Sequence, residues 1–151
     1  MLKVKKDVQA VIYVMGPEGP SFLLIERFDR PTGQFHWRLV KGTVRKGEKR
    51  EKALAREIGE EVGLTRIRVK CFLTAYSYEH AGVRHEVASY LVEADPSEPV
   101  RLASSDDGRP LRSYRWARPG EALALLRWEE ERRVLKLAVE KLMASPKEEG
   151  S

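Results

Sequence analysis

One stretch, residues 48–62, constrains the fold of this chain more than any other part of the sequence. Leu54, Ile58 and Val62 recur at every fourth position among residues that favour helices, and Gly63 stands where a helix would end. Apolar residues at this interval lie on one face of a helix. We therefore predict an amphipathic helix over residues 48–62 whose apolar stripe packs on a sheet.

The same helix would carry three carboxylates on a neighbouring face. Glu57, Glu60 and Glu61 are related as i, i+3 and i+4, so their side chains point the same way. Like charges at this spacing repel, and a hard divalent cation such as Mg²⁺ or Mn²⁺ would offset that repulsion. Glutamate-rich faces are also common on solvated helices, where lysines and arginines neutralise them. Taken alone, the three glutamates favour a solvated surface.

The rest of the chain alternates between strand and helix patterns. Runs of β-branched and aromatic residues bounded by glycine and proline predict strands at residues 8–15, 22–27, 36–40, 67–78, 85–94 and 114–116. Residues 95–112 are polar and predict a long loop. Residues 119–142 are helical in pattern, with a break near Arg127 and Trp128. This order predicts an α/β (α+β) fold with a central mixed sheet and helices in the middle and at the end of the chain.

Length and composition indicate a single globular domain. The chain has 151 residues, of which 42% are hydrophobic and 34% charged, as in a typical domain. We expect one domain over residues 1–144 and a flexible tail over residues 145–151. The lone Cys71 excludes an intramolecular disulfide and a zinc site built from several cysteines. The net charge of +5 favours anionic partners such as phosphates.

The sequence also bears on location and on macromolecular partners. No apolar run approaches the ~20 residues of a membrane-spanning helix, and the basic N-terminus is not followed by the long apolar core of a signal peptide. We therefore expect a cytoplasmic protein. A basic stripe with interleaved aromatic residues is missing, which argues against a nucleic-acid-binding surface. Oligomeric state does not follow from the sequence.

Residues 42–64 match a known motif at every defined position. The segment reads GTVRKGEKREKALAREIGEEVGL and resembles the Nudix box, Gly-x5-Glu-x7-Arg-Glu-U-x-Glu-Glu-x-Gly-U, in which U is a bulky aliphatic residue. The matching residues are Gly42, Glu48, Arg56, Glu57, Ile58, Glu60, Glu61, Gly63 and Leu64. The chain is therefore similar to Nudix hydrolases of the MutT type. The resemblance implies an α/β/α sandwich and hydrolysis of a nucleoside diphosphate linked to another group.

The resemblance further implies a divalent cation site in this box. Glu57, Glu60 and Glu61 would be the main ligands of Mg²⁺ or Mn²⁺, joined by the backbone carbonyl of Lys41. Glu48 would assist at the cation cluster or hold the loop. The glutamate face of the helix is then interpreted as a metal site rather than as a solvated surface.

The remaining box residues are expected to shape that site. Arg56 would orient a box glutamate through a salt bridge, and Gly42 and Gly63 would serve the backbone geometry. In the family, metal ions neutralise the diphosphate and activate a water, which attacks phosphorus in line while a carboxylate takes its proton. The three box glutamates are therefore the catalytic candidates.

The identity of the general base stays open. Glu57 and Glu61 are plausible within the box, whereas some family members use a glutamate in the loop before the last strand. Here that loop offers Glu98, Asp106 and Asp107, but no glutamate next to the strand at residues 114–116. We interpret the two aspartates, which precede a glycine, as an ordinary turn.

The residues that precede the box narrow the substrate class. Residues 36–42, HWRLVKG, resemble the Trp-x-x-Pro-Lys-Gly segment of diadenosine polyphosphate hydrolases, with Val40 in place of proline. The resemblance implies a dinucleoside polyphosphate such as diadenosine tetraphosphate, cleaved to ATP and AMP. The alternatives are nucleotide-sanitising, nucleotide-sugar, ADP-ribose and RNA 5′-end pyrophosphohydrolases. A non-catalytic Nudix-like binding module is a further alternative, but such modules usually lack a metal carboxylate.

Several residues are candidates for contact with such a nucleotide. Lys41 and Lys46 would reach phosphates, because the box loop places them near the cleft. The diadenosine subgroup uses a tyrosine after the box to stack on adenine, and Tyr76 or Tyr78 would take that position, with packing in the core or on the surface as the alternative. Arg84, His80 and His85 would contact phosphates, with solvated loop positions as the alternative.

Overall fold

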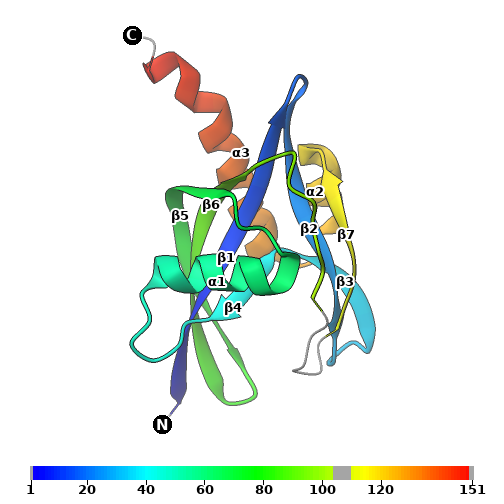
Figure 1. Cartoon of the computed structure of the whole chain (residues 1–151). Helices are drawn as coiled ribbons and strands as arrows, with labels where there is room; N and C mark the ends of the chain where they lie inside the picture. The colour runs from blue at the N-terminus through cyan, green and yellow to red at the C-terminus, as the bar shows by residue number, and fades with distance from the viewer. Residues whose placement is uncertain (1, 104–109, 150–151) are drawn as a thin grey trace.

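The computed structural model describes residues 2–103 and 110–149 (Figure 1). Seven strands and three helices follow one another along these residues. Their bounds are β1 Lys3–Gly16, β2 Gly19–Asp29, β3 Gln34–Arg38, β4 Val40–Thr43, α1 Arg50–Val62, β5 Ile67–His80, β6 Val83–Ala94, β7 Leu111–Ala117, α2 Pro119–Leu125 and α3 Glu129–Glu149.

The seven strands form one mixed sheet, as predicted. Its central path runs β3-β2-β1-β6-β5, with β4 added beside β1 and β7 beside β2. The β1–β6 pair is parallel and the other pairs are antiparallel. Along one edge β1 changes partner, because residues 13–16 pair with β2 whereas residues 7–10 pair with β4. This change of partner brings β4, the strand that enters the box, into the middle of the molecule.

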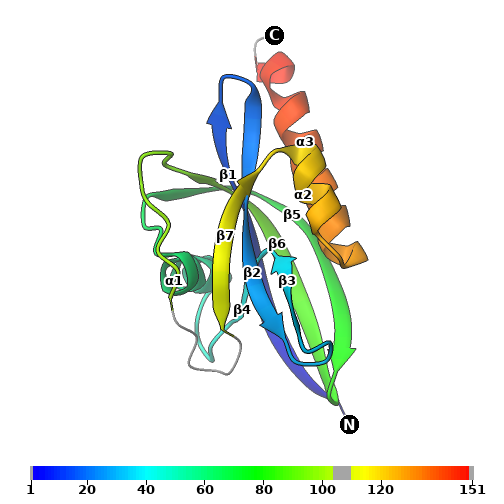
Figure 2. The same cartoon turned by 90° about the vertical axis from the view of Figure 1, so that its right-hand side faces the viewer.

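Helices cover both faces of this sheet, so the predicted α/β/α sandwich is confirmed. Figure 2 shows α1 on one side of the strands and α2 with α3 on the other. Alternate residues of β1 serve the two layers, since successive side chains of a strand point to opposite faces. Val8 and Ile12 pack in the core with α1, whereas Val11 and Tyr13 pack in the core with α2 and α3. Burial on both sides explains why residues 10–13 of this strand are apolar in succession.

The box helix α1 begins two residues later than predicted. It begins at Arg50 after the N-cap residue Lys49 and ends at Val62, with Gly63 as its C-cap. Gly63 has a φ of 70° and donates its N–H to the carbonyl of Gly59. This left-handed conformation suits glycine, because other residues adopt it at a steric cost.

The predicted strand at residues 36–40 is two strands. β3 ends at Arg38 and β4 begins at Val40, with the buried Leu39 between them. The N–H of Leu39 donates to the carboxylate of Glu131 at 2.9 Å. A local sequence pattern does not predict a contact between residues so far apart in the sequence.

The C-terminal helices follow the predicted break. α2 ends at Leu125 and α3 begins at Glu129, so the interruption falls at Arg127 and Trp128. α3 continues to Glu149, beyond the expected end at residue 142. The flexible tail stays a prediction, and residues 150–151 lie outside the described part of the chain. Among the described residues, no helix combines the length and apolar character needed to cross a membrane.

Candidate active site

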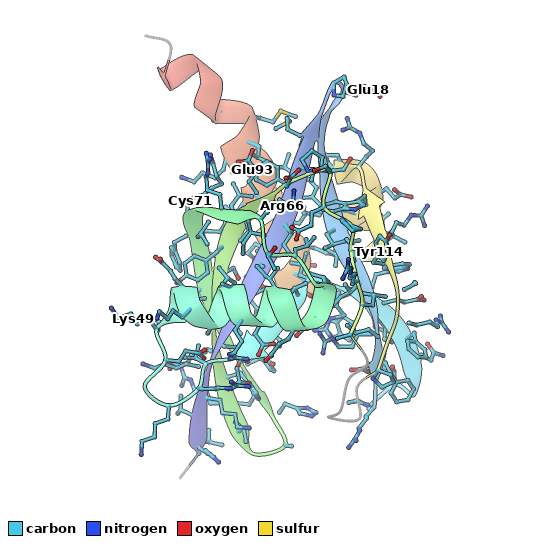
Figure 3. The ribbon with its side chains drawn as sticks, in the orientation of Figure 1. Glu18, Lys49, Arg66, Cys71, Glu93 and Tyr114 are labelled. Atoms are coloured by element: carbon cyan, nitrogen blue, oxygen red, sulfur yellow. The ribbon has the colours of Figure 1, made fainter. Side chains whose placement is uncertain are left out.

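The start of the box is defined by the close approach of a carboxylate to a glycine. A Cβ atom added to Gly42 would lie 2.0 Å from Cδ and 2.2 Å from Oε2 of Glu57. Gly42 belongs to β4, and Glu57 reaches it from α1. Figure 3 shows α1 lying across the front of the sheet, with Lys49 at its N-terminal end. Only glycine leaves room here for the Glu57 carboxylate in this position.

Arg56 binds the carboxylates of the box together. It makes two hydrogen bonds of 2.8 and 2.9 Å to Glu48, one of 2.6 Å to Glu57 and one of 3.1 Å to Glu60. Its remaining contact is a 3.0 Å hydrogen bond to the backbone carbonyl of Thr43. The salt bridge expected for Arg56 is therefore present, and it involves three glutamates rather than one. These contacts raise the pKa of Arg56, so the guanidinium stays charged.

Glu48 closes the loop that leads into α1. Its carboxylate accepts the backbone N–H of Arg45 at 3.0 Å in addition to the bonds from Arg56. Hydrogen bonds from the Arg56 guanidinium and from this N–H lower the pKa of Glu48 to about 2. Of the two roles expected for Glu48, these contacts correspond to holding the loop.

Glu61 is bound by an arginine of β2. Arg27 donates to Glu61 at 2.6 Å, and the arginine is only 8% exposed. Arg27 was not among the residues predicted for the site. The available signal was an arginine two positions after the apolar run in residues 22–25, since a charged side chain in such a place is usually paired.

As placed, the box carboxylates are turned towards arginines. Among the described residues, no three histidine, cysteine, aspartate or glutamate side chains gather closely enough to hold a metal ion. Arg56 draws Glu57 and Glu60, whereas Arg27 draws Glu61. The donor chemistry nevertheless fits a hard divalent cation, because the helix presents several carboxylate oxygens beside a backbone that Gly42 leaves open.

A cleft of about 520 Å³ lies next to the box. Its walls are residues 27–32, the start of β4, the end of β5 and the α2–α3 junction. Its lining carries the cationic side chains of Arg27, Arg30, Arg38, Lys41 and Arg127 together with the acidic ones of Asp29, Glu79, Glu130 and Glu131. Arg27 also touches Glu61, and Lys41 immediately precedes Gly42. Both residues therefore connect the cleft with the box.

A buried ion pair forms one wall of this cleft. The carboxylate of Glu131 is 2% exposed and accepts hydrogen bonds from Nε of Arg38 at 2.7 Å and from the backbone N–H of Leu39. The guanidinium of Arg38 also lies 4.0 Å from the ring centre of Trp128. Sequence reasoning missed this wall, because Glu131 resembles the other acidic residues in the first turn of α3.

The predicted nucleotide-binding residues fall into two groups. Lys41, Tyr76 and Tyr78 line the cleft. Lys46 is exposed in the loop before α1, and Arg84 pairs with a neighbouring glutamate at 3.8 Å. Neither is among the described residues that line the cleft.

The two tyrosines differ in their surroundings. The hydroxyl of Tyr76 donates to Oε1 of Gln9 at 3.3 Å, and burial raises the pKa of this hydroxyl. Tyr78 accepts a hydrogen bond from Nζ of Lys41. Its ring stacks on His85 with centroids 4.7 Å apart.

Glu98, an acidic candidate outside the box, binds the two residues that follow the box. The carboxylate of Glu98 accepts hydrogen bonds from both N–H and hydroxyl of Thr65 and from the N–H of Arg66. These bonds, led by that from Arg66, lower the pKa of Glu98. Its contacts are those of a loop anchor. Asp106 and Asp107 lie outside the described residues.

The fold and the site together define a class of enzyme. The carboxylate-rich helix, the glycine that admits one of its carboxylates and the adjoining cleft match the arrangement expected of a pyrophosphohydrolase. A family model described as the NUDIX domain matches residues 5–138. The chain therefore belongs to the NUDIX family.

Solved structures of this family have the same fold. An Ap4A hydrolase of C. elegans in a binary complex is 24% identical, with a TM-score of 0.79 over 92% of this chain and 98% of that chain. The MutT protein of Methanosarcina mazei Go1 is 21% identical, with a TM-score of 0.69 over 93% and 96% of the two chains. The NUDIX domain of Shewanella oneidensis NrtR, complexed with ADP ribose, is 16% identical, with a TM-score of 0.73 over 94% and 90%. A search of curated proteins finds no significant match.

Proposed function

We propose that this Nudix hydrolase cleaves a dinucleoside polyphosphate, such as diadenosine tetraphosphate, to ATP and AMP in the presence of Mg²⁺. The observation that carries the proposal is that two cationic side chains of the cleft connect it directly to the box. Arg27 lines the cleft and binds Glu61, and Lys41 lines the cleft one residue before Gly42. A polyphosphate held by the cleft would therefore extend to the box carboxylates.

Size, charge and similarity support this class of substrate. A cleft of about 520 Å³ lies within the usual range for small-molecule sites. Its cationic side chains suit several phosphates in a row, and its aromatic side chains, including Tyr76 and Trp128, suit a nucleobase. The Ap4A hydrolase of C. elegans has the same fold over nearly its whole length.

We propose that Glu57, Glu60 and Glu61, with the carbonyl of Lys41, hold the divalent cation, and that Glu48 supports them. When bound, Mg²⁺ or Mn²⁺ supplies neutralisation of the diphosphate oxygens and a more acidic water. The glutamates must turn from their arginine partners for this, and carboxylates on a helix can do so by changing rotamer.

The chain itself supplies position and charge to the reaction. Arg56 ties the loop and the helix together, so the carboxylates stay on one side of β4. Arg27 and Lys41 place positive charge along the polyphosphate. The oxygen of a water forms a bond to phosphorus, the anhydride P–O bond breaks, and Glu57 or Glu61 takes the water proton.

A substrate panel tests the proposal. Hydrolysis would be measured with and without Mg²⁺ on diadenosine tetraphosphate, ADP-ribose, nucleoside triphosphates and 5′-triphosphate RNA. Fast Mg²⁺-dependent release of ATP and AMP from the first compound is the expected result. A higher kcat/KM on ADP-ribose or on RNA would overturn the substrate and keep the reaction class. Absence of turnover on every compound would favour a binding module.

A further inference from the structure

A chain of contacts ties β4, the strand that enters the box, to the neighbouring strands β1, β6 and β5. It begins at the buried carboxylate of Asp7 on β1, which is 2% exposed. One oxygen of Asp7 accepts the hydroxyl of Thr43 at 3.0 Å, and the other lies 2.7 Å from Nδ1 of His85. The ring of His85 stacks on Tyr78 at an interplanar angle of 3°. The hydroxyl of Tyr78 in turn accepts a hydrogen bond from the ammonium of Lys41.

Strand register explains why these residues meet. Asp7 pairs with Thr43 in the β1–β4 ladder, and His85 pairs with Tyr78 in the β5–β6 ladder. Partners across a ladder point to the same face. Lys41 lies two residues before Thr43 and therefore on that face too. The contacts thus cross four strands on the cleft side of the sheet.

The chain of contacts ends at Lys41, which lies where the cleft meets the box. Nζ of Lys41 lies 4.4 Å from the centre of the Tyr78 ring as well as bonding its hydroxyl. A lysine side chain has many rotamers, and fixing them before a ligand binds lowers the entropic cost of binding. An ammonium carries three donors, so one lysine can hold a tyrosine hydroxyl and a phosphate oxygen together.

We propose that Tyr78, supported by His85 and Asp7, is a positioning residue that sets the ammonium of Lys41 for a phosphate of the substrate. Tyr78 then acts through Lys41 rather than by stacking on a base. The inference rests on the proposed function only to the extent that the ligand is a polyphosphate. It assigns a role to His85 and Asp7, which have no part in that function.

A double-mutant cycle tests the inference with a probe that lacks a base. Binding of inorganic tripolyphosphate would be measured by calorimetry in EDTA for the parent, Lys41→Met, Tyr78→Phe and the double variant. We expect Kd to rise about tenfold for Lys41→Met and about threefold for Tyr78→Phe, in keeping with loss of a charge-assisted contact and of its support. The double variant should bind as weakly as Lys41→Met alone, because coupled residues are not additive.

Kinetics on the best substrate of the panel provide a second readout. Tyr78→Phe should raise KM by the same factor and leave kcat within about twofold, because the residue acts on a binding contact. Tyr90→Phe is the matched control, since Tyr90 lies on β6 and packs against Phe72 outside the cleft. His85→Ala should reproduce Tyr78→Phe in variants that remain folded by thermal unfolding.

Three outcomes would overturn the inference. Multiplying effects of Lys41→Met and Tyr78→Phe would show that Tyr78 binds phosphate by itself. Unchanged tripolyphosphate binding in Tyr78→Phe would show that Lys41 binds phosphate equally well without the Tyr78 hydroxyl. A fall in kcat at constant KM would place Tyr78 in the chemical step. Since tripolyphosphate binding needs neither metal nor turnover, failure of the proposed substrate would not produce any of these results.

Discussion

The box and the cleft wall are both built around an arginine. The two arginines differ in how far along the sequence their binding partners lie. Arg56 finds all its side-chain and backbone partners within 13 residues. Arg38 binds Glu131 across a separation of 93 residues, and Leu39 binds the same carboxylate across 92. The first cluster is set by helical spacing, whereas the second exists only after the sheet and α3 have come together. The contacts within the box thus depend on residues close together in the sequence, whereas the shape of the cleft depends on the whole fold.

The largest expected effect comes from removing a box carboxylate without disturbing the cleft wall. Glu61→Gln should lower kcat by about 100-fold to 1,000-fold, as expected for loss of a catalytic carboxylate. The fold should persist, because glutamine keeps an oxygen that can accept a hydrogen bond from Arg27. Steady-state kinetics with Mg²⁺ and thermal unfolding would measure the two properties. Glu60→Gln should likewise abolish most of the turnover.

A matched substitution elsewhere on α1 tests whether the effect depends on the position of the glutamate or only on the loss of one negative charge. Glu51→Gln removes an acidic residue from the exposed first turn of the same helix and should leave kcat unchanged. Parental activity in Glu61→Gln and Glu60→Gln would mean that the metal-site assignment is wrong.

The cleft wall should respond in the opposite way, with stability changing more than chemistry. Glu131→Ala would leave Arg38 and the N–H of Leu39 without their shared acceptor. Breaking a buried pair in this way should lower the free energy of unfolding by about 3 kcal/mol. Urea denaturation would measure it. Glu129→Ala, at an exposed position of the same turn, should change it by less than about 0.5 kcal/mol. Equal losses in the two variants would argue against a wall held by this pair.

A smaller effect is expected where the box touches β4. Gly42→Ala would place Cβ 2.0 Å from Cδ of Glu57 and would push the end of that side chain away. Activity should fall about tenfold to 100-fold, because a displacement of about 1 Å in a catalytic group is enough to do so. Stability should change little, since a flexible side chain can move. Gly59→Ala, at a site on α1 with nothing within 4 Å, should keep full activity. A loss of stability rather than of activity in Gly42→Ala would indicate a different packing.

The smallest effect concerns the acid sensitivity of the box loop. The pKa of Glu48 is lowered from 4.5 to about 2 by hydrogen bonds from Arg56 and Arg45, so the folded state favours the charged carboxylate. Its contribution to stability is therefore complete above about pH 4.5 and is lost as the pH falls towards 2. The difference in Tm between the parent and Glu48→Gln, measured in EDTA, should be constant above pH 5 and shrink below about pH 4.5. A difference that grows on acidification would contradict this pairing.

The comparison also explains which parts of the molecule the sequence predicts. The α1 helix and its terminal glycine follow from short spacings, whereas the Arg56 salt bridge was expected from the resemblance to the Nudix family. The mixed sheet follows from the order of apolar runs, and the sandwich was implied by the family resemblance. Arg27, by contrast, meets Glu61 across 34 residues of sequence, once α1 has packed on the sheet that contains β2. Lys46 and Arg84 show the converse, since their charge fitted a phosphate site but their positions lie outside the cleft lining.

The partner change along β1 has a consequence for how the molecule opens. β1 is paired with β6 from Lys3 to Tyr13, whereas β4 is held to it only from Val40 to Thr43. Short ladders open at lower free energy than long ones, and amide hydrogen exchange reports this directly. The amides of β1 should therefore exchange slowly and those of β4 faster. The loop that leads into α1 can then open locally while the central strands stay paired. The enzyme can therefore adjust around a bound ligand without global unfolding.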